Sequence, residues 1–128
     1  MKKIQKLEDL DTWKEAIKLL KMIYSLLHKL PEEEKYNIKK HLMQCARNAP
    51  GNIAEGFGRY FSRDSVQFYR IATGSLNEIK SDITACRELE YLSKEECEKI
   101  TKQIDKCLSL IYGLIRSAWK NKESSRRS

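Results

Sequence analysis

The chain has 128 residues, of which 41% are hydrophobic and 34% charged, and its net charge is +7. This length suits one domain with a buried core, and five glycines with two prolines favour helices over a sheet or a disordered chain. The sequence has no apolar run of about 18 residues and no apolar signal-peptide core, so we expect a cytoplasmic protein without a membrane span.

The first predicted helix runs from Leu10 to Leu30, after a basic N-terminal arm formed by residues 1–9. Apolar residues recur there at three- and four-residue steps, which indicates one wide apolar helix face. Thr12 and Glu15 have the spacing of a capping box. Pro31 ends the helix, because the residue before a proline avoids helical dihedral angles.

The second predicted helix begins near Glu33 and ends at Glu55. Pro50 lies inside its apolar pattern, which stays in phase on both sides, so we expect a kink at Pro50 and no break. Gly56 is expected to end the helix as a left-handed C-cap.

Two more helices follow, the first with Ser62 as N-cap and an end near Glu90. The last helix opens with Ser93 and Glu96, a second capping box, and runs to about Lys120. Residues 121–128 are polar and uncapped, so we expect a disordered basic C-terminal tail.

Four amphipathic helices with short connections predict an all-α, antiparallel up-down-up-down four-helix bundle over residues 10–120. This topology places both termini and the connection between the second and third helices at one end. Basic residues exceed acidic ones at that end, and acidic residues exceed basic ones at the other. The excess positive charge belongs mainly to the first and last helices, which are neighbours in the bundle.

Basic residues in these places predict contact with the phosphates of RNA or DNA. Tyr60 and Phe61 lie between Arg59 and Arg63 and are suited to stacking on unpaired bases, or else pack under their loop. The alternative for the basic residues is a solvated surface without a ligand. The candidate nucleic-acid contacts are Lys14, Lys18, Lys21, Arg59, Tyr60, Arg63 and Arg116.

Two short stretches combine glycines with polar residues: Asn52 to Arg59, and Gly74 to Glu78. The first serves either as a ligand site or as structural support, in which Asn52 and Glu55 satisfy backbone groups near Pro50. A glycine inside a helix is costly, so Gly74 suggests a close approach of another helix or subunit. The residues assigned to this structural motif are Pro50, Asn52, Glu55, Gly56, Gly58, Gly74 and Glu78.

The sequence offers no motif for catalysis, and we expect no enzyme activity, cofactor or metal. A di-metal site in a bundle needs Glu-x-x-His, but the third residue after Glu55 is Gly58 and after Glu78 is Ser81. The four cysteines form no C-x-x-C pair and are expected to be reduced core thiols.

The chain resembles proteins encoded in 23S ribosomal RNA intervening sequences, the S23 family, over residues 7–119. The resemblance rests on Leu10 to Ala16, a match to L-x-x-W-x-x-A, and on the two glycine-containing stretches. Asn48 and Gly51 depart from it, since the family usually has serines around the proline.

The resemblance implies small four-helix bundles that form ring-like homopentamers. It also implies a distant similarity to the accessory variability proteins of diversity-generating retroelements, which are basic pentamers that bind nucleic acid and a reverse transcriptase. Apolar residues off the main helix stripes independently suggest an oligomer; they are Leu19, Leu26, Leu110 and Trp119.

Together these observations predict a non-enzymatic homo-oligomer that binds RNA or DNA through basic surfaces. The alternative is a protein-interaction scaffold, or a reverse-transcriptase accessory protein, that does not recognise nucleic acid sequence directly.

Overall fold

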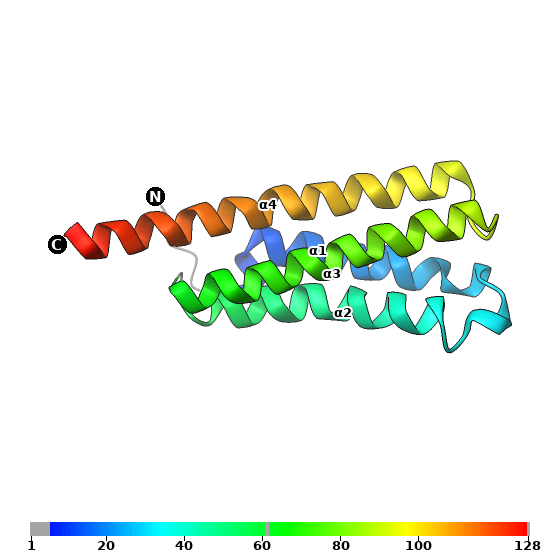
Figure 1. Ribbon diagram of the computed structural model, residues 1–128, viewed down its shortest axis with the longest axis horizontal. Helices are drawn as coiled ribbons and strands as arrows, with labels where there is room; N and C mark the ends of the chain where they lie inside the picture. The colour runs from blue at the N-terminus through cyan, green and yellow to red at the C-terminus, as the bar shows by residue number, and fades with distance from the viewer. Residues whose placement is uncertain (1–5, 61, 128) are drawn as a thin grey trace.

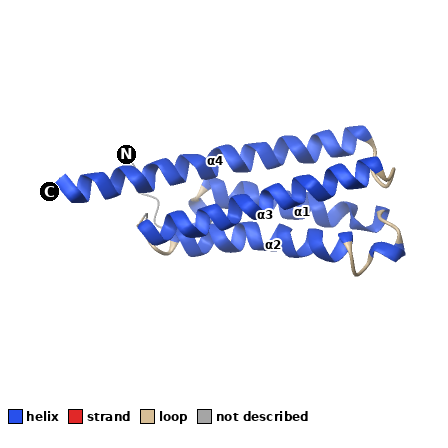
Figure 2. Cartoon of the chain, in the orientation of Figure 1, coloured by secondary structure: helices blue, strands red, loops and turns tan. Residues whose placement is uncertain are grey.

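The structure is a computed structural model that describes residues 6–60 and 62–127, with side chains described as far as Lys120. Every regular element in these ranges is a helix (Figure 2). The four α-helices are α1 (Asp11–Leu26), α2 (Ile38–Phe57), α3 (Arg63–Glu88) and α4 (Lys94–Arg127). Three short 3-10 helices accompany them: η1 (Leu7–Asp9), η2 (Leu27–Lys29) and η3 (Glu32–Glu34). The predicted all-α, four-helix fold is confirmed.

The four α-helices lie side by side, and consecutive helices run in alternating directions (Figure 1). Helix α1 contacts α2 and α4, and helix α3 contacts the same two neighbours. The α2–α3 connection and the C-terminal end of α4 lie at one end of the bundle, and the other two connections lie at the opposite end (Figure 1). Within the described residues, none of the helices has the length and apolar character that crossing a membrane requires.

One core fills the space between the helices, and it contains residues from all four apolar stripes. Leu19 and Leu26 are buried in it, although we expected them to lie off the main stripes. The apolar face of α1 is therefore wider than the predicted stripe, and these two leucines give no support to an oligomer. The largest fully buried side chains are Tyr69, Leu19, Ile23, Leu42, Ile53, Leu76, Ile79, Ile83, Ile100, Ile104 and Ile111.

Helix α1 begins and ends differently from the prediction. Its N-cap is Leu10, which is buried, and the Thr12 side chain lies inside the first turn, so the predicted capping box of Thr12 and Glu15 is wrong. The α-helix ends at Leu26 and is followed directly by the 3-10 helix η2, which ends two residues before Pro31. Glu32–Glu34 form η3, so α2 begins at Ile38, later than the predicted Glu33.

Helix α2 continues through Pro50 as a single α-helix that ends at Phe57, and the kink at Pro50 stays a prediction. Gly56 is not a left-handed C-cap, because none of the described glycines has a positive φ and Gly56 lies inside the helix. The C-cap is Gly58, at φ −64°. The left-handed residue of this connection is Tyr60, at φ 54°.

Gly56 is required by packing against α3. A Cβ atom added at Gly56 would lie 2.4 Å from Cε1 of Tyr69, a fully buried ring. Ser65 supports the same contact, since its hydroxyl donates a hydrogen bond of 2.7 Å to the Gly56 carbonyl. The Ser65 hydroxyl also accepts a hydrogen bond of 3.1 Å from the backbone N–H of Ser62, the predicted N-cap of α3.

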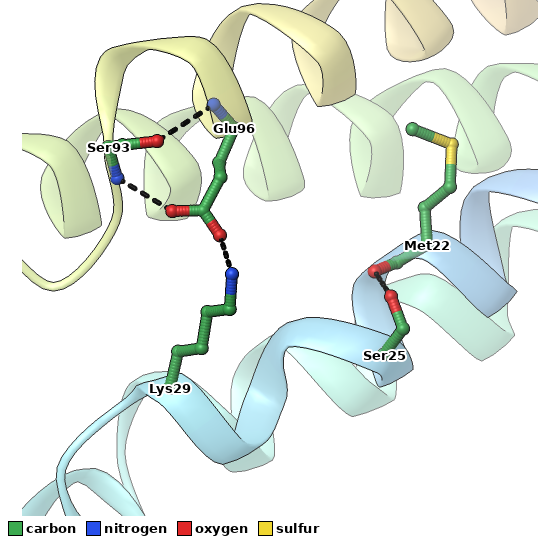
Figure 3. A network of polar contacts seen from close by, with 5 residues as sticks. All are labelled: Met22, Ser25, Lys29, Ser93 and Glu96. Atoms are coloured by element: carbon green, nitrogen blue, oxygen red, sulfur yellow. Dashed lines mark hydrogen bonds and ion pairs between the residues drawn. The ribbon is translucent and has the colours of Figure 1, made fainter.

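Helix α4 opens with the predicted capping box. The Glu96 N–H donates to the Ser93 hydroxyl at 3.1 Å, and the Ser93 N–H donates to the Glu96 carboxylate at 3.0 Å (Figure 3). The same carboxylate forms an ion pair with Lys29, which joins the end of η2 to the start of α4 (Figure 3). The Lys29 hydrogen bond, followed by those from Ser93, lowers the pKa of Glu96 to about 2.

The Glu96 carboxylate makes the free energy of unfolding depend on pH in the acid range. Because its folded pKa lies below the ordinary 4.5, it stabilises the fold above about pH 4.5, and this contribution is lost as the pH falls towards 2. We expect Glu96→Gln to destabilise the protein near neutral pH, and the difference from wild type to shrink in acid. Urea unfolding from about pH 6 to about pH 2 measures this difference. Glu95→Gln, at an exposed neighbour, is the control, and an equal effect of both variants would contradict the assignment.

At the other end of the helix, α4 continues to Arg127, beyond the end expected near Lys120. Residues 121–127, predicted as a disordered tail, are therefore helical. No glycine or proline follows Lys120 to stop a helix, which is consistent with this extension. The predicted basic arm, residues 1–9, lies partly outside the described residues, and its later part forms η1.

Candidate nucleic-acid interface

A groove of about 950 Å³ separates α1 from α4, and lysines are its main charged residues. Lys18 comes from α1, and Lys99, Lys102 and Lys106 come from α4. The rest of the lining is apolar or polar: Met22, Ser25, Leu26, Ile100 and Gln103, with the acids Glu96 and Asp105. We call this surface the basic groove.

The two acids of the basic groove are paired with lysines from outside it. Glu96 forms its ion pair with Lys29, and Asp105 accepts a hydrogen bond of 2.9 Å from Lys80. Among the described side chains, Lys18, Lys99 and Lys102 form no ion pair. The positive charge of these three ammonium groups therefore faces solvent in the groove, where an anion can approach it.

Glu15 pairs with the fourth lysine of the groove, Lys106, and with Gln103. Lys106 lies 2.9 Å from the Glu15 carboxylate, and Gln103 donates hydrogen bonds to the Glu15 backbone carbonyl at 2.9 Å and to its carboxylate at 2.8 Å. The hydrogen bonds from Gln103 and then Lys106 lower the pKa of Glu15, and Glu15 raises the pKa of Lys106. This network joins α1 to α4 and holds the two lysine-bearing helices in register.

Part of the basic groove could be predicted from the sequence. Lys18 lines it, and Lys14 and Lys21 are exposed on the same face of α1, one turn to either side. Lys14 lies 3.9 Å from Asp11, a surface pair that contributes little to stability. Lys99 is not among the predicted contacts, because the acidic residues before it in sequence make this segment look negatively charged. Its spacing of three from Lys102 is the signal that could have found it.

The predicted arginine–tyrosine cluster lies at the end of the bundle, away from the basic groove. Tyr60 is 88% exposed, so it does not pack under its loop. Its positive φ turns the chain between α2 and α3. The Arg59 guanidinium lies 5.2 Å from the centre of the Phe68 ring and 3.9 Å from the Glu55 carboxylate, which holds it over the first turns of α3. Phe61 lies outside the described residues.

Arg63 and Arg116 are exposed and lie on α3 and α4. Arg63 lines a second hollow, of about 570 Å³, with Arg70, Ile71 and Trp119. The structure therefore separates the predicted contacts into the α1 face, the α2–α3 connection and the α3–α4 side.

The residues of the predicted structural motif have different roles. Pro50 and Gly56 are buried in α2, whereas Glu55 is exposed and pairs with Arg59. Asn52 donates a hydrogen bond of 2.8 Å to the Asn48 carbonyl, not to the Ala46 carbonyl that Pro50 leaves without its helical donor. Asn52 thus satisfies a backbone group near Pro50, as predicted, although not the acceptor that the proline frees, whereas Glu55 pairs with Arg59 instead.

Gly74 and Glu78 lie on exposed positions of α3. A Cβ atom at Gly74 would have no neighbour within 4 Å, so no other part of the described chain approaches it closely. Glu78 faces α2, and its carboxylate accepts a hydrogen bond of 3.2 Å from the Cys45 thiol.

All four cysteines are buried free thiols, as predicted. Burial raises the pKa of Cys107 to about 12 and that of Cys86 to about 11. For Cys45, burial followed by the hydrogen bond to Glu78 raises the pKa to about 12.

Comparison with solved structures identifies a similar fold. A crystal structure of a protein of unknown function from the S23 ribosomal protein family of Bacteroides thetaiotaomicron has a TM-score of 0.72. It covers 81% of this chain and 97% of its own length at 20% identity, so it is evidence for the fold alone. Among curated proteins, no sequence matches this chain.

The sequence also matches a family model directly. The model describes the 23S rRNA-intervening sequence protein, and the match extends over residues 8–113, most of the bundle. It includes Leu10 to Ala16 and both glycine-containing stretches, the residues on which the resemblance rests. The chain therefore belongs to the 23S rRNA-intervening sequence protein family.

Proposed function

We propose that this protein is a non-enzymatic helical bundle that binds the phosphate backbone of RNA or DNA along the basic groove. The observation that carries the proposal is the convergence of Lys18, Lys99 and Lys102 from two helices on one groove whose acids are already paired. Such a row of lysines neutralises phosphates and releases their counterions without reading bases. The net charge of +7 and the family's association with 23S rRNA support a polyanionic ligand.

The α2–α3 connection offers a second contact of a different kind. Tyr60 presents an exposed ring between Arg59 and Arg63, an arrangement suited to stacking on an unpaired base. We therefore propose single-stranded or looped RNA as the preferred ligand, and a cytoplasmic location, where such RNA is made and where buried thiols stay reduced.

Salt dependence tests the proposal. We expect the affinity for a labelled RNA, measured by fluorescence anisotropy, to fall steeply as salt rises. The groove variant Lys18→Gln, Lys99→Gln, Lys102→Gln should bind more weakly, and its logarithmic salt slope should be smaller by about 3, or about one per lysine that contacts phosphate.

The control variant carries Lys40→Gln, Arg47→Gln and Arg87→Gln, exposed positions of α2 and α3. It loses the same charge as the groove variant, so it should retain more of the wild-type slope if the groove is the site. Equal slopes for both variants would contradict a groove-specific contact. A flat salt response of the wild-type protein would contradict phosphate binding altogether.

The exposed apolar residues near Arg63 favour a second function, self-association into a docking scaffold. Ile71 is 47% exposed and Trp119 39% exposed, and both line the hollow between α3 and α4. We propose this side as the contact between copies of the chain in a homo-oligomer, with the pentamer of the S23 resemblance as the expected size. Light scattering after size exclusion, with and without RNA, tests both functions. Loss of assembly in Ile71→Ser, together with RNA binding that is unaffected by the groove variant, would favour the scaffold.

A further inference from the structure

Four side chains form a polar cluster between α2 and α3, away from the basic groove. His41 and Cys45 are four residues apart on α2, and Glu78 and Asp82 are four residues apart on α3. Residues at this spacing lie on one helix face, so the facing pairs converge from two helices. The cluster was not predicted from the sequence, because it contains neither C-x-x-C nor Glu-x-x-His, and its signal is the His-x-x-x-Cys spacing of His41 and Cys45.

Three atoms of the cluster surround a point that a metal ion can occupy. Cys45 Sγ lies 3.5 Å from His41 Nε2 and 3.2 Å from Glu78 Oε2, and the last two atoms are 3.8 Å apart. A tetrahedral ion with zinc–ligand bonds of about 2.0–2.3 Å needs ligand atoms about 3.3–3.6 Å apart. The observed triangle matches this requirement to within a few tenths of an ångström.

Asp82 prepares the histidine for this role. Its carboxylate is hydrogen-bonded to His41 Nδ1. Because a carboxylate can only accept a hydrogen bond, Nδ1 is the ring nitrogen that carries the proton. In the neutral ring the lone pair then lies on Nε2, the atom that faces Cys45 and Glu78. A carboxylate on the far nitrogen is the usual second partner of a metal-bound histidine, and it fixes the ring's tautomer and orientation.

We propose that His41, Cys45 and Glu78 bind a Zn²⁺ ion, with Asp82 as the residue that orients His41. One thiolate, one imidazole and one carboxylate favour Zn²⁺ over Mg²⁺ or Ca²⁺, which prefer oxygen ligands alone. The Glu78 side chain is 60% exposed and that of His41 42%, so solvent reaches the ion and a water molecule completes the tetrahedron.

Binding of Zn²⁺ replaces the hydrogen bond of the Cys45 thiol with a bond to the metal. In the structure the Cys45 S–H donates to the Glu78 carboxylate. When the ion binds, the S–H bond breaks, an S–Zn bond forms and one proton passes to the solvent, so no oxidant or reductant is needed. The ion then links α2 to α3, and it should stabilise the folded protein by mass action. The proposal is independent of nucleic-acid binding.

Cobalt titration tests the site. We expect Co²⁺ to bind one per chain and to give a thiolate-to-cobalt charge-transfer band, which added Zn²⁺ removes. Cys45→Ser should lose the band, while Cys107→Ser, which removes another buried thiol, on α4, should keep it. The absence of the band in wild type, or its survival in Cys45→Ser, would overturn the proposal.

Variants of the two partly exposed ligands, His41 and Glu78, test the site even if Cys45→Ser does not fold. His41→Gln and Glu78→Gln should bind Zn²⁺ more weakly and lose the rise in melting temperature that Zn²⁺ gives to wild type. Asp82→Asn should lower the affinity by about 10–100-fold and keep the cobalt spectrum. His28→Gln, at an exposed histidine outside the cluster, should change nothing. Unchanged Zn²⁺ affinity in both His41→Gln and Glu78→Gln would also overturn the proposal.

Discussion

We expect Gly56→Ala to lower the free energy of unfolding by about 1–3 kcal/mol, the usual cost of forcing extra volume into a packed core. The added Cβ would lie 2.4 Å from Cε1 and 2.7 Å from Cδ1 of Tyr69. That ring is fully buried between helices, so it cannot turn aside without moving its neighbours. The contact therefore opposes the gain in helix propensity that alanine brings. Urea unfolding followed by circular dichroism measures the change.

Two other glycines provide matched controls. Gly51 lies in α2 and Gly74 in α3, and a Cβ atom at either position has no neighbour within 4 Å. Gly51→Ala and Gly74→Ala should therefore raise the free energy of unfolding by about 0.5–1 kcal/mol, the propensity difference between the two residues. A Gly56→Ala protein with the same free energy of unfolding as wild type, or a higher one, would contradict the packing argument. A destabilised Gly74→Ala oligomer would indicate that another copy of the chain approaches α3 at Gly74.

The second large effect is expected at Tyr69, with the opposite sign. Its hydroxyl is buried and has no hydrogen-bond partner among the described residues, and burial raises the pKa of the group to about 12. A buried hydroxyl without a partner costs about 1–3 kcal/mol. Tyr69→Phe keeps the ring and removes the hydroxyl, so we expect the free energy of unfolding to rise by about 1–2 kcal/mol.

Tyr112→Phe is the control for this substitution. Tyr112 is exposed on α4, where loss of the hydroxyl should leave stability unchanged. Calorimetry of both variants at the same protein concentration makes the comparison. A lower melting temperature for Tyr69→Phe than for wild type would show that the Tyr69 hydroxyl is hydrogen-bonded in solution.

The fold could be predicted because each helix has a clear apolar stripe. Ser62, Ser93 and Glu96 mark helix starts by local chemistry, and the structure places them there. Local signals failed where tertiary contacts decide. Thr12 has the spacing of an N-cap, but the helix begins earlier, after Leu10, and Thr12 is buried in its first turn. Gly56 is a residue type typical of a C-cap, but it lies inside the helix, where the Tyr69 ring leaves no room for a side chain.

The candidate sites were harder to predict, because they form between helices. Lys18 and Lys102 are far apart in sequence, and their meeting in one groove depends on the packing of α1 against α4. The cluster of His41 with Glu78 depends likewise on the register of α2 against α3. Net charge and helix order indicated which surfaces are basic. They did not indicate which acidic residues are paired, because Asp105 of the groove is paired with Lys80 on α3, a helix that does not line the groove.

The close contact of Gly56 with Tyr69 bears on how relatives of this protein are grouped. The stretch from Asn52 to Arg59 is the most distinctive part of the sequence, yet Gly56, the second-last residue of α2, is required by an aromatic side chain on the next helix. Because this stretch is tied to helix packing, a chain that shares it is expected to share the spacing of α2 and α3, and its partners have to be established separately.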